Sequence, residues 1–143
     1  EKFLAYRQAI GMEALPLDSR AFPTLMQRAR DGKLIALIAD RDLSSSGIDV
    51  EFFGGVARMP AGPAIIAIRT EIPLVTAFVS YTESGIHIDL REIAIPTDGD
   101  EESRIKVAVQ LCADNFAVGI KASPHDWHMM QRIWVDRDFV ERR

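Results

Sequence analysis

The strongest chemical signal in the sequence is Asp40-Arg41-Asp42, which directly follows an apolar stretch at residues 34–39. A carboxylate at the end of a buried strand can orient a histidine general base and stabilise the imidazolium that forms. The same Asp-x-Asp spacing suits a hard divalent cation, which prefers oxygen ligands. A third interpretation is a surface loop whose acids pair with Arg41 or cap a turn. The spacing leaves these three interpretations open.

Two further features are candidates for binding. Arg58 precedes an expected helix that begins near Gly62-Pro63, and an arginine beside a helix N-terminus favours an anion such as phosphate. An exposed arginine with no ligand is the alternative. Phe52 and Phe53, which precede two glycines, either line an apolar tunnel or belong to the core.

The histidines and the cysteine are weaker candidates. His87 and Glu92 have the His-x-x-x-x-Glu spacing of an acyltransferase signature, but they fall on an alternating strand, and we interpret the match as coincidence. His125 and His128 would share a helix face, but no third ligand follows at a suitable spacing, so we expect no metal. Cys112 lies on an apolar helical stripe and is expected to be an inert core residue.

Composition narrows the class of protein. The chain has 143 residues, of which 48% are hydrophobic and 27% charged, as in one globular domain, and we expect residues 1–143 to form one. A net charge of -4 gives no electrostatic case for nucleic-acid binding. The sequence starts without methionine in a helical pattern, so we expect a longer chain.

Hydrophobic spacing and turn residues predict the elements that must position these side chains. Helices are expected at residues 2–10, 20–31 and 64–68, after Asp100, and in a last segment carrying Trp127, Met130 and Trp134. Strands are expected at 12–17, 34–39, 73–81 and 85–95, with a brief extended piece at 48–52. The initial helix–strand–helix–strand order is typical of a parallel sheet with helical crossovers.

Several short elements, taken together and in order, resemble the phosphatidylinositol mannoside acyltransferases, which belong with the lipid A lauroyl and myristoyl acyltransferases. The elements that carry the resemblance are Tyr6-Arg7, Leu15-Pro16-Leu17, Ala39-Asp40-Arg41-Asp42-Leu43, Phe52-Phe53-Gly54, Met59-Pro60-Ala61-Gly62-Pro63-Ala64 and Pro124-His125-Asp126-Trp127-His128-Met129, with Gln131 and Trp134. The resemblance spans almost the whole chain.

The resemblance implies acyl transfer from a thioester, acyl-CoA or acyl carrier protein, to a sugar hydroxyl of a membrane glycolipid such as a phosphatidylinositol mannoside, without a cofactor. It implies a mixed, mainly parallel α/β sheet flanked by helices, as in glycerol-3-phosphate acyltransferases. The family's base is the histidine of a His-x-x-x-x-Asp motif, and by this resemblance Asp40 is its acidic partner. The expected substrate-binding residues are Arg7, Arg41, Asp42, Phe52, Phe53 and Arg58.

The sequence also departs from the family pattern. The His-x-x-x-x-Asp motif and the N-terminal membrane-associating region are not in it. We therefore expect the C-terminal half of an enzyme that is peripheral to the cytoplasmic face of the plasma membrane, and expect this half to be inactive alone. The first strands of the sheet would be missing, leaving residues 34–39 poorly covered. Two alternatives stay open: a metal-dependent glycosyltransferase using Asp40 and Asp42, and a non-catalytic lipid- or partner-binding module.

Overall fold

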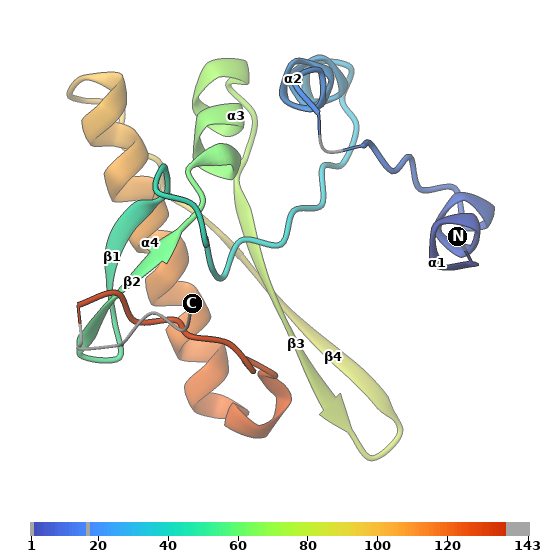
Figure 1. Ribbon diagram of the computed structural model, residues 1–143, viewed down its shortest axis with the longest axis vertical. Helices are drawn as coiled ribbons and strands as arrows, with labels where there is room; N and C mark the ends of the chain where they lie inside the picture. Colours follow the sequence, from blue (N-terminus) through green and yellow to red (C-terminus); the bar gives the residue numbers. More distant parts are fainter. Residues whose placement is uncertain (1, 17, 137–143) are drawn as a thin grey trace, which may run out of the picture. The chain divides into compact units, whose positions relative to one another are not determined.

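The computed structural model describes residues 2–16 and 18–136, which fall into two compact units, Glu1–Ile35 and Ala36–Arg143 (Figure 1). The fold is mixed α and β. Two small antiparallel sheets and several helices make up the described residues.

The first unit contains helices α1 (Lys2–Ala9) and α2 (Ala21–Arg30), both as predicted. Gly11 and Gly32 follow these helices with φ of 85° and 72°, a conformation that favours glycine after a helix. Glu13 lies between the helices and accepts hydrogen bonds of 2.7 and 2.9 Å from the Arg28 guanidinium. The strand predicted at 12–17 is not found: residues 12–16 pair with no strand, and Leu17 lies outside the described residues.

Helix α4 (Glu101–Ala122) is the element against which the second unit packs. Its start agrees with the prediction, because the Asp100 carboxylate accepts a 2.7 Å hydrogen bond from the Ser103 amide and caps the helix. Burial raises the pKa of the Cys112 thiol to about 11, in keeping with a core position. Within the described residues, no helix combines the length and the apolar character that a membrane span requires.

Strands β1 (Ile48–Phe52) and β2 (Gly55–Met59) form an antiparallel hairpin beside α4. Its two turn residues, Phe53 and Gly54, have φ of 48° and 74°, the pattern of the type I′ turn whose twist matches a hairpin. The sequence predicted β1 as an extended piece but missed β2. The Phe53-Gly54 pair was the sequence feature from which the hairpin turn, and so β2, could have been predicted.

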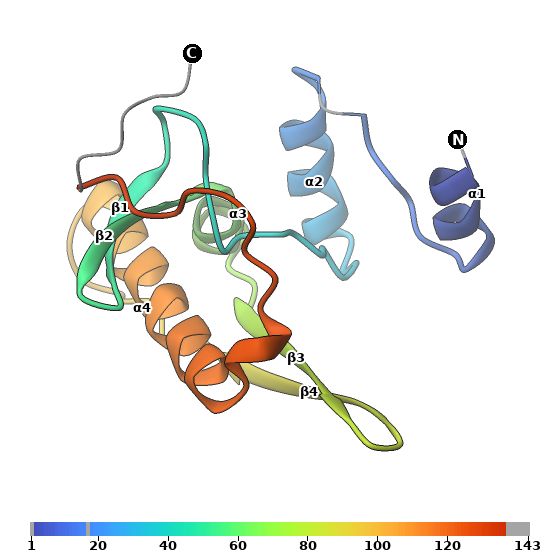
Figure 2. The ribbon, with the colours of Figure 1, turned by 60° about the horizontal axis from the view of Figure 1, so that its bottom comes forward.

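Helix α3 (Gly62–Thr70) and the second hairpin, β3 (Val75–Thr82) and β4 (Gly85–Glu92), agree with the prediction. Asn115 donates a hydrogen bond of 3.2 Å to Thr76 on β3, and Gly119 lets Phe78 approach the α4 backbone. Asn115 and Gly119 share one face of α4, whereas Gln110 on another face bonds the backbone of β1. Figure 1 and Figure 2 show the tip of the β3–β4 hairpin extending away from α4.

Three predictions about the elements are wrong or unsupported. Residues 34–39 form no strand, because no described strand lies beside them to share backbone hydrogen bonds, and Leu34 and Ile38 are 95% and 88% exposed. The last helix is absent from the described residues: a single 3-10 turn at Pro124–Asp126 is followed by irregular chain. The predicted mainly parallel sheet is not confirmed, since both described sheets are antiparallel.

The irregular C-terminal segment is fastened to the β1–β2 hairpin instead of forming a helix. Trp134 makes an antiparallel bridge with Ala57, and its indole N–H donates to the carbonyl of Phe52 at 3.1 Å. The Val135 amide donates to the carbonyl of Val56 at 2.7 Å. These backbone bonds require an extended chain, which explains why the apolar spacing of residues 127–134 does not produce a helix.

Candidate functional site

Asp40 is held by a residue from the far end of the chain. Its Oδ2 accepts a 3.0 Å hydrogen bond from the indole Nε1–H of Trp127, and both side chains are half-buried. The Trp127 ring meets the buried Phe52 ring edge-on, with centroids 5.9 Å apart. Among the described residues, no hydrogen bond reaches the other oxygen, Oδ1. One face of the carboxylate is therefore fixed while the other stays available to an N–H donor.

Asp42 shapes the loop that follows. Its Oδ1 accepts a 2.7 Å hydrogen bond from the Ser44 amide, and its own amide donates to the Arg58 carbonyl at 2.7 Å. This is the turn-capping role that the sequence left open for one of the two acids. A Cβ added to Gly47 would lie 2.6 Å from Cγ of Arg58 and 2.9 Å from Cβ of Asp42. Only glycine lets the loop pass so closely.

Arg41, between the two acids, has an unsatisfied nitrogen. Its Nη1 is buried and has no hydrogen-bond partner among the described residues. A buried guanidinium nitrogen without an acceptor costs free energy, because it has lost water without gaining a partner. One oxygen of each neighbouring carboxylate accepts a hydrogen bond from Trp127 or Ser44, and neither carboxylate accepts one from this nitrogen. Arg41 is therefore a donor that lacks an acceptor in the described residues.

Arg58 is engaged by an acid on the adjacent strand. Asp49 stands opposite it in the β1–β2 register, and its two oxygens accept 2.6 and 3.1 Å hydrogen bonds from the guanidinium. The guanidinium holds the pKa of the Asp49 carboxyl below its ordinary value, against the smaller opposite effect of burial. The sequence had placed Arg58 with the N-terminus of α3. The structure shows its guanidinium in a cross-strand ion pair, and anion binding by Arg58 stays a prediction.

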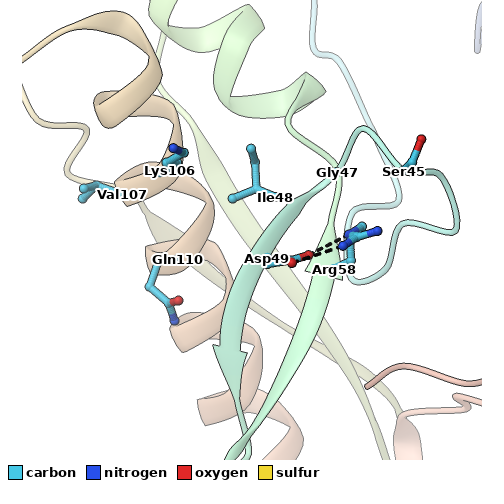
Figure 3. Close-up of a pocket in the computed structure, with 8 residues that line it drawn as sticks. All are labelled: Ser45, Gly47, Ile48, Asp49, Arg58, Lys106, Val107 and Gln110. Atoms are coloured by element: carbon cyan, nitrogen blue, oxygen red, sulfur yellow. Dashed lines mark hydrogen bonds and ion pairs between the residues drawn. The ribbon is translucent and has the colours of Figure 1, made fainter. Parts of the chain in front are cut away.

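This ion pair lies in a cavity of about 580 Å³ (Figure 3). The cavity is bounded by the loop that contains Ser45, by the β1–β2 hairpin and by α4. Its lining residues are Ser45, Gly47, Ile48, Asp49, Arg58, Lys106, Val107 and Gln110. Sequence spacing gave no sign of Lys106, Val107 and Gln110, because their place in the lining depends on how α4 packs beside β1. The cavity brings two cationic side chains and a serine together, but each cation also has an acidic partner.

The two phenylalanines have different surroundings. Phe52 is buried in the core of the second unit, and Phe53 is 38% exposed at the hairpin turn, with its ring 4.6 Å from that of Phe52. The ammonium of Lys121 lies 5.7 Å from the centroid of the Phe53 ring. The core interpretation therefore holds for Phe52. Arg7 lies in the last turn of α1, in the other unit, and its role stays a prediction.

Among the described residues, the histidines do not gather into a second site. His87 and Glu92 occupy β4 at an odd spacing and so project to opposite faces, a geometry that does not favour their action as a pair. Asp126 lies 3.5 Å from the His125 imidazole, and accepts a 3.0 Å hydrogen bond from the Tyr81 amide. In the part of the chain that the structure describes, no three His, Cys, Asp or Glu side chains gather as a metal site would require.

Comparisons with known proteins agree on one family. The family model described as "Bacterial lipid A biosynthesis acyltransferase" matches residues 1–136. Phosphatidylinositol mannoside acyltransferases from two strains of Mycobacterium tuberculosis are 36% identical over 146 residues, covering 100% of this chain and 45% of each relative. The protein of the same name from Mycolicibacterium smegmatis is 37% identical over 145 residues, covering 99% of this chain and 46% of its own length. The chain thus spans just under half the length of these relatives.

Proposed function

Because the chain belongs to the bacterial lipid A biosynthesis acyltransferase family, we propose that the full-length protein transfers a fatty acyl chain from a thioester to a sugar hydroxyl of a membrane glycolipid. The relatives are named for phosphatidylinositol mannoside, and we propose this glycolipid as the acceptor. Acyl-CoA is the proposed donor, with acyl carrier protein as the alternative, and no cofactor takes part. Family membership speaks against the metal-dependent glycosyltransferase.

The proposed chemistry needs a base for the sugar hydroxyl. A histidine outside residues 1–143 removes the hydroxyl proton, and the alkoxide attacks the thioester carbonyl. The C–S bond then breaks, and the imidazolium returns the proton to the leaving sulfur, which departs as a thiol. Asp40 accepts a hydrogen bond from that imidazole, which fixes its tautomer and stabilises the imidazolium. Asp40 is thus the catalytic contribution of this chain.

One observation carries this assignment. Trp127 holds Oδ2 of Asp40, and Oδ1 accepts no hydrogen bond from the described residues. A carboxylate that is anchored by one oxygen and open at the other is suited to orienting an imidazole. The unsatisfied Nη1 of Arg41 beside it supports an anionic substrate group, such as a phosphate of the donor or of the acceptor headgroup. Arg7, Arg58, Asp42 and Phe53 are further proposed substrate contacts, and Phe52 supports them from the core.

The remaining proposals concern the whole protein. We place it peripherally on the cytoplasmic face of the plasma membrane, with the membrane contact in the half outside residues 1–143. The finer fold that we propose for the complete protein is the mainly parallel sheet of the glycerol-3-phosphate acyltransferase type. Both proposals rest on family resemblance, and the 45% coverage of the relatives leaves room for them.

The test is acyl transfer by the full-length protein, measured with labelled acyl-CoA and a phosphatidylinositol mannoside acceptor. We expect Asp40→Asn to lower kcat by about a hundredfold or more, because the amide does not stabilise the imidazolium as a carboxylate does. Asp40→Glu should retain more activity than Asp40→Asn. Glu83→Gln, in the exposed β3–β4 turn, is the matched control. Full activity of Asp40→Asn would show that the assigned role is wrong.

A further inference from the structure

The outer face of the β3–β4 hairpin is exposed and apolar except at its base, where Glu92 lies opposite Val75. We define it by the side chains that the register places on one side of the two strands: Val75, Ala77, Val79 and Tyr81 of β3 with Ile86, Ile88, Leu90 and Glu92 of β4. Tyr81 and Leu90 are 67% and 65% exposed. The sequence alternation had suggested that the other face, with His87, Asp89 and Arg91, would be the one in water.

The inner face of the hairpin already has a partner, and this fixes which side points outward. Thr76 is buried against α4, and a Cβ added to Gly119 would lie 2.5 Å from Cγ of Phe78. A slip of one residue in the register would turn Phe78 away from Gly119. The outer face is therefore set outward by packing on the inner face.

The outer face has the composition of a packed sheet surface. Val79 stands opposite Ile88, and Tyr81 opposite Ile86, and such β-branched and aromatic cross-strand pairs are typical of strands whose side chains are covered. A contiguous apolar patch on a protein in water usually marks an interaction surface. A two-stranded hairpin is also only marginally stable by itself and gains stability from further strands or layers.

We propose that the outer face is covered, in the full-length protein, by polypeptide that lies outside residues 1–143. Curated relatives that match all of this chain use only 45% of their own length to do so, which provides ample polypeptide for a covering layer. Strand β4 also has no neighbouring strand on its second edge among the described residues. A covering polypeptide can supply both an apolar layer and backbone partners for that edge.

The same edge argues against a lipid bilayer as the occupant. Hydrocarbon offers no partners for the unpaired N–H and C=O groups of an open strand edge, and inserting them costs several kcal/mol per group. The outer face also carries no lysine or arginine that would attract anionic headgroups. A protein layer satisfies what the face and the edge require, whereas acyl chains satisfy the face alone.

Site-specific photo-cross-linking of the full-length protein tests this proposal. p-Benzoylphenylalanine replaces Ile88 on the outer face, and in a matched control it replaces the adjacent His87 on the opposite face. The irradiated protein is digested and its cross-linked peptides are identified by mass spectrometry, with and without phosphatidylinositol vesicles. The probe at Val79 is the second variant if the protein with the probe at position 88 does not fold.

We expect the probe at position 88 to cross-link to the same chain outside residues 1–143, without vesicles, and with several-fold higher yield than the probe at position 87. Cross-links only to residues 1–35, only to a second isotopically distinguished copy, only to lipid, or to nothing would each overturn the proposal. The outcome does not depend on Asp40, so this inference and the proposed function can fail separately.

Discussion

At the scale of single residues, the site depends on the contact between Asp40 and Trp127. The indole donates its one N–H to Oδ2 at 3.0 Å, and its ring is braced by Phe52 at 5.9 Å between centroids. A donor in a rigid, packed ring limits the rotation of the carboxylate better than water could. If Asp40 has the role proposed above, Trp127 is a positioning residue, which acts on the reaction through Asp40.

Trp127→Phe tests this role, because it removes the N–H and keeps a ring that can pack against Phe52. We expect kcat of the full-length enzyme to fall roughly tenfold, about the loss of one hydrogen bond to a charged group. KM should change little, since no substrate contact is removed. Combined with Asp40→Asn, the loss should be less than additive in free energy. Fully additive losses would show that Trp127 does not act through Asp40.

At the scale of elements, two features of the β hairpins set their positions. The Asp49–Arg58 pair joins β1 to β2, and Gly119 lets β3 lie directly on α4. The ion pair is partly exposed, so its contribution is screened by solvent and salt. The glycine contact is steric and should be the more important of the two for stability.

The Asp49–Arg58 pair should make the hairpin sensitive to acid. Arg58 lowers the folded-state pKa of Asp49, so the stabilisation is present above the ordinary value of about 4 and is lost as the pH falls through the lowered pKa. We expect Asp49→Asn to reduce the fall in Tm between about pH 5 and pH 3. Equal falls in Tm for the two proteins would assign the acid sensitivity to other carboxylates.

Gly119→Ala should destabilise the protein despite the better helix propensity of alanine. The new Cβ would lie 2.8 Å from the Phe78 Cβ, an atom close to the strand backbone that has little freedom to move. Overpacking costs about 1–3 kcal/mol, against a gain of about 1 kcal/mol from propensity. Urea denaturation should therefore show a lower free energy of unfolding. Val118→Ala, on an exposed position of the same turn, should be nearly neutral.

At the scale of the whole molecule, local signals predicted what is local. Asp100, the hydrophobic spacing and the turn residues predicted α4, α2 and the β3–β4 hairpin correctly. The prediction of a strand at residues 34–39 was wrong because a strand needs a neighbouring strand, and the residue types do not show whether one is present. The prediction of a helix that includes residues 127–134 was wrong because hydrogen bonds to β1, β2 and Asp40 outweigh the helical spacing of its apolar residues.

The candidate site was predictable in part. Asp40 stood out by its place after an apolar stretch, and the structure shows it anchored. Its contact with Trp127, 87 residues away, could not be predicted from the spacing of residues in the sequence. The unsatisfied nitrogen of Arg41 and the Asp49–Arg58 pair were equally hidden, because each depends on which atoms the fold brings within hydrogen-bond reach.

The Asp40–Trp127 bond also bears on how the protein is made. The ribosome releases Asp40 long before Trp127, so the carboxylate stays unanchored through the synthesis of the intervening chain. Closing a loop of this length costs conformational entropy that rises slowly with the number of residues enclosed. Anchoring can therefore occur only after the chain has been made as far as Trp127. A stop codon at position 124 would yield a chain that includes the residues of α4 and both hairpins but lacks Trp127, the anchor of Asp40.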